Sequence, residues 1–213
     1  MTPGLVLAAC LCIGYACGSL PWGLWLGRAF RGVDVRTVGS QNLGATNVYR
    51  SLGPVLGVTT LVLDIAKGAL PVWLVPGAPF ADAFPGGPQW CAIAVGFAAV
   101  GGHVWTCFAR FKGGKGVATT AGVLMALSPP SFGVFVAVFL VTLLTTRYVS
   151  LGSILGAVSF TIALAFFSTA GPRSPGFLLG AVLAVVVVVR HRDNIGRLAR
   201  GEERRFTFTR SGS

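Results

Sequence analysis

The chain has 213 residues, of which 54% are hydrophobic and 11% are charged, and its mean hydropathy is strongly positive. A soluble core could not use so much apolar surface, so the composition excludes an ordinary soluble domain and indicates a polytopic membrane protein. Lys and Arg outnumber Asp and Glu by 17 to 6, but they cluster just after apolar runs, which favours cationic cytoplasmic loops over binding of nucleic acid.

The first apolar run, residues 4–27, is long enough to cross about 30 Å of hydrocarbon. No basic residue precedes it and Arg28 follows it. We therefore expect a retained transmembrane helix with a cytoplasmic C-terminal end, not a cleaved signal peptide. Gly18, Ser19 and Pro21 should kink or loosen this helix.

The second apolar run, residues 52–75, leads outward again and contains two charged residues, Asp64 and Lys67. Their spacing of three places them on one helix face, where they can pair. A lone charge near the bilayer centre costs roughly 2.5–3.5 kcal/mol, so we do not expect two of them to face lipid. An ion pair that fixes helix packing and a direct part in substrate binding both remain open.

The later apolar runs are residues 90–108, 117–146, 151–168 and 177–189. The run 117–146 is interrupted by Ser-Pro-Pro-Ser at 128–131. Two short helices joined at these prolines would return Arg147 to the cytoplasm, which the charge pattern favours over one continuous span. A Gly/Pro turn is expected at 169–176, and a basic tail follows Val189.

These runs predict one all-α membrane domain over residues 1–213 with about seven transmembrane helices, an external N-terminus and a cytoplasmic C-terminus. The five cysteines lie mostly in apolar runs, without a CxxC pair or a metal-like grouping with histidine. We therefore expect small buried side chains and no disulfide framework.

The polar stretch GSQNLGATNVYR at residues 39–50 stands out between two apolar runs. Glycine and short hydrogen-bonding side chains allow a backbone to wrap an anion, and Arg50 can pair with two of its oxygens. On this stretch alone, a solvated cytoplasmic turn is an equal alternative. Two further polar stretches, residues 111–119 and 191–194, are predicted on the same side of the membrane and favour anion binding.

The second stretch, FKGGKGVAT at 111–119, is superficially similar to a P-loop but lacks its Ser or Thr, because Gly116 follows Lys115. This argues against an ATPase. A glycine turn flanked by Lys112 and Lys115, with a helix beginning near Val117, is nevertheless well suited to a phosphate.

In the third stretch, His191 could take a proton from an alcohol and Asn194 could hydrogen-bond a hydroxyl or a phosphate. A histidine without a special role at the membrane interface is the alternative. Neither His103 nor His191 is followed by Asp at the HxxxxD spacing, which argues against acyltransferases that use that motif.

Six segments together resemble one family, the bacterial acyl-phosphate-dependent glycerol-3-phosphate acyltransferases (PlsY family). They are GSLPWG at 18–23, GVDVRTVGSQNLGATNVYRSLG at 32–53, DIAKG at 64–68, GHVWTCFARFKGGKGVATTAG at 102–122, RYVSLGSI at 147–154 and HRDNIGRLARGEERRF at 191–206. The resemblance covers almost the whole chain in the same order.

This resemblance implies a bacterial inner-membrane enzyme, with its active site facing the cytoplasm, that moves an acyl group from acyl phosphate to the 1-hydroxyl of glycerol 3-phosphate. It implies no metal, no cofactor and no acyl-CoA, and beyond membrane lipid it indicates no protein partner. The residues that it implies as catalytic are Ser40, Lys115, His191 and Asn194, and those for substrate binding are Arg50, Asn42, Gly44, Thr46, Asn47, Lys112, Gly113, Gly114 and Ser153.

Two positions depart from the family pattern. Gln41 stands where glycine is common and could crowd a backbone turn, and Thr106 replaces the proline of a GHxxP pattern, which should mainly alter a bend. Whether His191 acts as a general base or only as a substrate ligand stays open.

Two other classes are disfavoured. A secondary transporter of an organic phosphate would need binding groups at the bilayer midplane and paired broken helices, and this chain has polar stretches on one predicted side only. A non-catalytic lipid-binding protein would not need such detailed polar loops.

Overall fold

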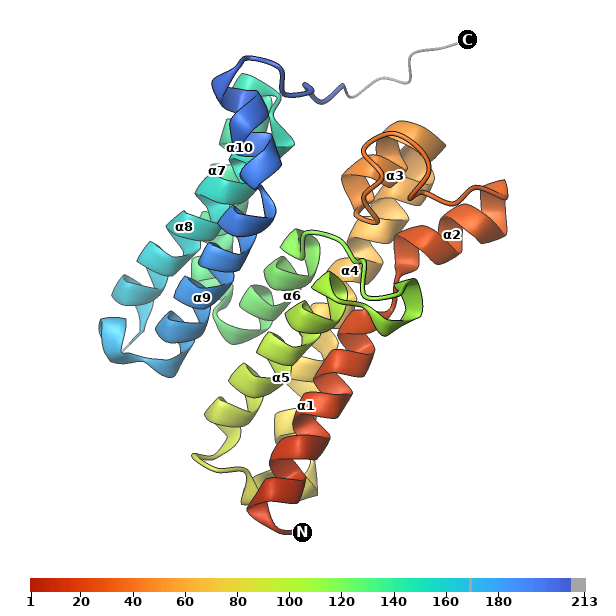
Figure 1. Ribbon diagram of the computed structural model, residues 1–213. Coiled ribbons are helices and arrows are strands. Elements are labelled where there is room, and N and C mark those ends of the chain that lie inside the picture. Colours follow the sequence, from red (N-terminus) through yellow and green to blue (C-terminus); the bar gives the residue numbers. More distant parts are fainter. Residues whose placement is uncertain (169, 208–213) are drawn as a thin grey trace. The chain divides into compact units, whose positions relative to one another are not determined.

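The computed structural model describes residues 1–168 and 170–207 (Figure 1). Over these residues the chain is helical, without a β-strand, which confirms the all-α membrane class. Thr169 of the predicted turn and the tail from residue 208 lie outside the described residues. The chain divides into two compact units, Met1–Leu127 and Ser128–Ser213, and the expectation of one domain over residues 1–213 stays a prediction.

The first unit holds six α-helices and three short 3₁₀ turns. The helices are α1 Pro3–Ser19, α2 Trp22–Arg31, α3 Ala45–Leu52, α4 Pro54–Leu74, α5 Pro88–Val104 and α6 Val117–Leu127, and the turns are Val75–Gly77, Pro79–Ala83 and Cys107–Ala109. Helix α1 packs on α5, and α4 packs on α6 and α3 (Figure 1). The predicted kink in the first apolar run is present as a break at Leu20 and Pro21, where α1 ends and α2 begins.

Small residues let the backbones of α1 and α5 approach closely. A side-chain carbon on Gly18 would overlap the carbonyl oxygen of Ala99, and one on Gly102 would overlap that of Tyr15. Packing of this kind suits a membrane, where helix association depends on close van der Waals contact rather than on the hydrophobic effect.

The second unit contains α7 Pro129–Thr146, α8 Val149–Phe167, the 3₁₀ turn Gly171–Arg173, α9 Pro175–Arg190 and α10 Arg192–Ala199. Helix α8 packs between α7 and α9. Its Gly152 and Gly156 receive the rings of Phe139 and Phe135, which stack on one another along α7. The predicted break in the run 117–146 is also present, because α6 ends at Leu127 and α7 begins at Pro129.

Within the described residues, five helical segments are long and apolar enough to cross a membrane. They are Pro3–Arg31, Pro54–Gly77, Pro88–Ala109, α7 and α8, and α9 with α10 would make a sixth across a 59° bend. Helix α6, with 11 residues, is shorter. The multi-pass class is therefore confirmed, whereas the count of seven and the orientation of the termini stay predictions.

Candidate active site

The polar stretch 39–50 is folded over an apolar cluster at one end of the first unit. The cluster consists of Leu24, Val35, Leu43, Val48, Leu52, Leu56 and Ala109. Ala109 comes from the turn that leads to the glycine stretch, so the two polar stretches share one core. The opposite end of the unit holds the N-terminus and the 3₁₀ turns after α4 (Figure 1). Within this unit, the two stretches therefore lie at the same end, as predicted.

The amide of Asn47 holds the first loop together. Asn47 is 3% exposed, and its Nδ2 donates to the carbonyl oxygens of Val35, Val38 and Asn42 at 2.9, 3.2 and 2.9 Å. Its Oδ1 accepts from the Ser40 N–H at 2.8 Å. The side chain thus satisfies the loop's own backbone, and its predicted part in substrate binding stays a prediction.

The backbone turn at the centre of this loop requires a left-handed residue. Gln41 has φ of 59°, a region in which a residue with a side chain is strained and glycine is not. This conformation explains why glycine suits the position. Next to it, the Asn42 Oδ1 accepts from the Gly44 N–H at 2.8 Å, immediately before α3 begins at Ala45.

Cations surround the loop, and one carboxylate balances some of them. Asp34 pairs with Arg36 at 2.6 Å and with Arg28 at 2.8 Å. Hydrogen bonds from Arg36 hold the pKa of Asp34 well below its usual range. Arg50 lies in the last turn of α3 and is exposed, as Ser40 is.

The glycine stretch folds back onto the end of α5. The Gly113 N–H donates to the Val104 carbonyl at 3.1 Å, and the Gly114 N–H donates to the His103 carbonyl at 3.2 Å. A side-chain carbon on Gly113 would overlap the His103 carbonyl oxygen. The glycines are therefore needed for close approach to the end of α5. Lys115 follows, half-buried, just before α6.

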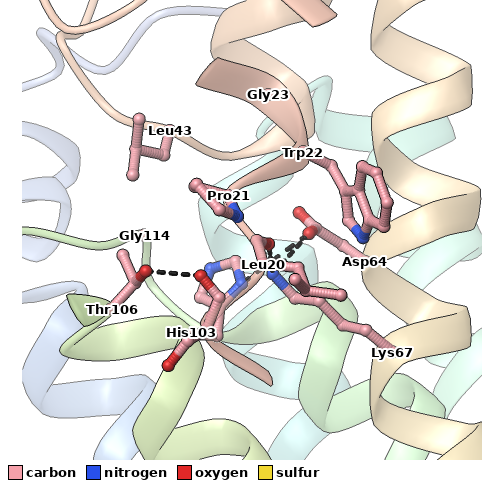
Figure 2. Close-up of a pocket in the computed structure, with 11 residues that line it drawn as sticks. Leu20, Pro21, Trp22, Gly23, Leu43, Asp64, Lys67, His103, Thr106 and Gly114 are labelled. Carbon is pink, nitrogen blue, oxygen red and sulfur yellow. Dashed lines mark hydrogen bonds and ion pairs between the residues drawn. The ribbon is translucent and has the colours of Figure 1, made fainter. Parts of the chain in front are cut away.

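A small cavity joins the two stretches, since Leu43 from one and Gly114 from the other line it (Figure 2). Asp64 and Lys67 reach the same cavity, and they form the predicted ion pair at 2.8 Å. The Lys67 ammonium also donates to the Leu20 carbonyl at 2.7 Å, at the break between α1 and α2. The pair therefore ties α4 to the break between α1 and α2, as the packing alternative predicts, and a direct part in substrate binding stays a prediction.

Thr106, the second departure from the family pattern, is buried near this cavity. Its hydroxyl donates to the carbonyl oxygen of Ser19 at the end of α1. Its φ of −65° is the angle that a proline would impose. The backbone bend is therefore of the kind a proline fits, and the hydroxyl supplies an extra tie to α1.

In the second unit, His191 and Asn194 flank the bend between α9 and α10, and both are buried. The His191 Nδ1 lies 2.7 Å from the Val187 carbonyl oxygen. A carbonyl only accepts, so Nδ1 is the protonated nitrogen, and in the neutral ring Nε2 carries the lone pair. Ser153, on α8, donates to the Val149 carbonyl at 2.8 Å.

A carboxylate that the sequence analysis did not single out organises this end of the second unit. Glu203 Oε1 accepts from Asn194 at 2.6 Å and from Ser150 at 2.8 Å, and Oε2 accepts from Arg197 at 2.8 Å. Burial opposes ionisation of Glu203, but these hydrogen bonds prevail and lower its pKa. The available signal was a single segment, GEERRF, in which acidic residues lie among arginines.

The predicted site residues thus fall into two groups. Ser40, Asn42, Gly44, Thr46, Asn47, Arg50, Lys112, Gly113, Gly114 and Lys115 belong to the first unit, and Ser153, His191 and Asn194 belong to the second. Their meeting in one site stays a prediction. Among the described residues, no group of three or more His, Cys, Asp or Glu side chains could hold a metal ion.

The fold and the two loops define an integral membrane protein with cationic polar loops at one end of its apolar helices. Comparison with known proteins identifies the family. The family model for glycerol-3-phosphate acyltransferase matches residues 8–201. Proteins of that description from Geobacter sulfurreducens and Fusobacterium nucleatum are 48% and 41% identical, over 95% and 91% of this chain and 97% and 95% of their own lengths.

Solved structures agree with the sequence relatives. The chain superposes with a TM-score of 0.83 and 37% identity on the glycerol 3-phosphate form of PlsY (YgiH), an integral membrane glycerol 3-phosphate acyltransferase, covering 94% of this chain and 96% of that one. The lysophosphatidic acid form gives 0.81 and 36%. The chain therefore belongs to the PlsY family of glycerol-3-phosphate acyltransferases and is a multi-pass membrane acyltransferase.

Proposed function

We propose that this acyltransferase moves a fatty acyl group from acyl phosphate to the 1-hydroxyl of glycerol 3-phosphate. The hydroxyl oxygen forms a bond to the acyl carbonyl carbon, the bond from that carbon to the phosphate oxygen breaks, and phosphate leaves with the electron pair. The products are lysophosphatidic acid and phosphate. Because the donor is already activated, the enzyme needs chiefly to orient the alcohol and to stabilise charge on oxygen.

One observation carries this proposal. The loop that bears Ser40 and Arg50 and the loop that bears Lys115 share an apolar core and meet at one cavity. Two phosphorylated substrates need two cationic binding elements, and this end of the first unit provides them. The glycerol 3-phosphate form of the similar PlsY structure supports the choice of acceptor.

The second unit completes the site in this proposal. The His191 Nδ1 is directed at the Val187 carbonyl. Its Nε2 therefore accepts a hydrogen bond from the 1-hydroxyl of glycerol 3-phosphate and orients that hydroxyl. The hydroxyl proton passes to a substrate phosphate, so His191 acts as a ligand rather than as the final base. Asn194, held by Glu203, donates to a hydroxyl or phosphate oxygen.

The membrane placement also belongs to the proposal. The enzyme lies in the bacterial inner membrane with both loops facing the cytoplasm, where the anionic soluble substrate is found. Arg28, Arg31 and Arg36, which flank the first loop, support this orientation. The reaction needs no metal and does not use acyl-CoA.

The test is a release assay on purified protein in lipid nanodiscs, with palmitoyl phosphate and glycerol 3-phosphate. Phosphate and lysophosphatidic acid should appear in equal amounts, with or without a metal chelator, and should not appear when palmitoyl-CoA replaces the donor. Release of phosphate without lysophosphatidic acid, or turnover with palmitoyl-CoA, would contradict the proposal.

Substitutions of the two cations, Lys115 and Arg50, test the site itself. Lys115→Ala should lower turnover by about 100-fold or more, since a developing oxyanion loses a donor. Arg50→Lys should raise the KM for glycerol 3-phosphate, because the two-pronged guanidinium contact is lost. Arg31→Ala removes an exposed cation at the end of α2 and is the matched control, expected to keep wild-type kinetics.

A further inference from the structure

A chain of buried polar side chains stands behind the glycine stretch. The Asp64 carboxylate on α4 pairs with Lys67 at 2.8 Å and lies 3.8 Å from the His103 Nδ1. That same nitrogen lies 3.1 Å from the Thr119 hydroxyl on α6. All four side chains are buried, with exposed fractions of 6% or less. Three helices, α4, α5 and α6, are thus joined through one imidazole.

The other edge of this imidazole faces the glycine stretch. A side-chain carbon on Gly114 would overlap the His103 Nε2, so the ring lies directly against the Gly114 backbone. The His103 carbonyl meanwhile accepts from the Gly114 N–H. His103 therefore supports the loop through both its backbone and its ring.

The network reaches the loop from both sides. Residue 103 precedes the glycines and contacts Gly114, while Thr119 lies in the first turn of α6, just after Lys115. Close packing reinforces this arrangement, because a side-chain carbon on Gly68 of α4 would overlap the Thr119 carbonyl oxygen. A shift of the ring would displace the loop and the start of α6 together.

Burying a carboxylate and an ammonium costs free energy, and an apolar pair would often serve stability as well. Asp64 and Lys67 instead place a carboxylate 3.8 Å from the His103 Nδ1, and these three residues line the same cavity as Gly114. This arrangement fixes the direction of the ring more than it adds packing.

We propose that His103 is a positioning residue for the glycine stretch: held by Thr119 beside the Asp64 carboxylate, its ring fixes the position of Gly113–Lys115 and so the side chain that Lys115 presents to the phosphate of the acyl donor. This inference rests on the proposed function and adds to it that this stretch, rather than the loop before Arg50, holds the phosphate of acyl phosphate. The predicted kinetic effect is selective, since a displaced glycine stretch should weaken binding of acyl phosphate more than binding of glycerol 3-phosphate.

Two substitutions of His103 test the two edges of its ring separately. His103→Asn keeps a polar atom near Nδ1 but withdraws the side chain from Gly114, whereas His103→Gln extends a polar atom toward the Nε2 position. We expect His103→Asn to raise the KM for palmitoyl phosphate about tenfold, with the KM for glycerol 3-phosphate changed less than about twofold. His103→Gln should recover part of the loss.

A double variant tests the contact directly. Gly114→Ala places a methyl group against the His103 ring and should impair donor use. Combined with His103→Asn, the shorter side chain makes room, so the double variant should use palmitoyl phosphate better than Gly114→Ala alone. Such non-additivity is expected only for groups in contact.

Thr60→Val is the matched control. Thr60 is fully buried on α4, one turn before Asp64, and its hydroxyl donates to the Leu56 carbonyl within its own helix. Wild-type KM values are expected for this variant. Should neither His103 variant insert and fold, Thr119→Val removes the hydroxyl facing Nδ1 and should raise the donor KM in the same selective way.

The outcomes are distinguishable. A wild-type enzyme that does not use palmitoyl phosphate would overturn the proposed function. A wild-type enzyme that uses it, with folded His103 variants whose two KM values are unchanged or rise equally, would overturn the positioning role alone. Additive effects in the double variant would overturn the Gly114 contact on which it depends.

Discussion

The amide of Asn47 offers the sharpest test of how the first loop is held. Asn47→Asp keeps the shape and the acceptor for Ser40 but replaces the donor of three hydrogen bonds with an oxygen facing three carbonyls. Two N–H groups serve these carbonyls, so two full hydrogen bonds are lost. At about 1 kcal/mol for each bond, and more for a buried carbonyl left without a donor, the variant should be about 2–4 kcal/mol less stable.

Thermal unfolding in detergent and steady-state kinetics would measure this effect. For a chain of this size the loss corresponds to a fall in Tm of about 5–15 °C. Displacement of Ser40 should also lower kcat/KM by about tenfold or more, because small errors in substrate orientation are costly. Ser51→Ala is the control, since it removes only a 3.4 Å hydrogen bond to the Asn47 Oδ1. Wild-type Tm and kcat/KM for Asn47→Asp would refute the idea that this amide holds the loop.

Three further predictions use other positions. Gln41→Gly should keep or slightly raise Tm, because the φ of residue 41 is 59° and glycine adopts this angle without strain. Gln41→Val should lower the free energy of unfolding by about 1–2 kcal/mol, since a β-branched side chain fits this region poorly. Equal Tm values for the two variants would contradict the strained turn. Thr106→Pro should keep activity because the φ of Thr106 is already −65°. It should lower the free energy of unfolding by about 1 kcal/mol, because the hydrogen bond from the Thr106 hydroxyl to the Ser19 carbonyl is lost. A variant that does not fold in the membrane would contradict this account of the bend. Because the pKa of Glu203 is lower in the folded protein, its ionised carboxylate stabilises the fold at neutral pH. This stabilisation is lost as the pH falls below the ordinary pKa of 4.5 and through the lowered pKa of the folded state. Glu203→Gln should therefore have a lower Tm at neutral pH and a flatter acid profile, and parallel profiles for the two proteins would exclude Glu203 as the source.

Much of the fold could be predicted because hydropathy and charge carry it. The predicted second span, residues 52–75, corresponds closely to α4, Pro54–Leu74, and the helix predicted near Val117 begins there as α6. Helix α6, however, ends after 11 residues at Leu127. Hydropathy cannot fix such lengths or the number of crossings, because a short apolar helix packed on α4 has the same composition as one that faces lipid.

The site was harder to predict, because the sequence does not say whether a polar side chain serves a ligand or its own backbone. Asn47 looks like a binding residue in the sequence, and only the fold brings the carbonyls of Val35 and Val38 to its amide. Glu203 was taken as part of a basic tail. Its partners Asn194 and Ser150 are far from each other in the sequence, and only the folded chain after α10 brings Glu203 to both. His103 was noted only for the motif that it lacks.

The two loops share a physical strategy that follows from these contacts. Asn42 and Asn47 hydrogen-bond backbone groups of the first loop, and the N–H groups of Gly113 and Gly114 hydrogen-bond the end of α5. In the proposed function, groups already committed to the fold need no reorganisation when an anionic substrate binds. Recognition then falls to the side chains mounted on these frames, with Arg50 exposed at the end of α3. Substitutions in the frames should therefore alter both stability and kinetics, whereas substitution of Arg50 should alter substrate KM with little change in Tm.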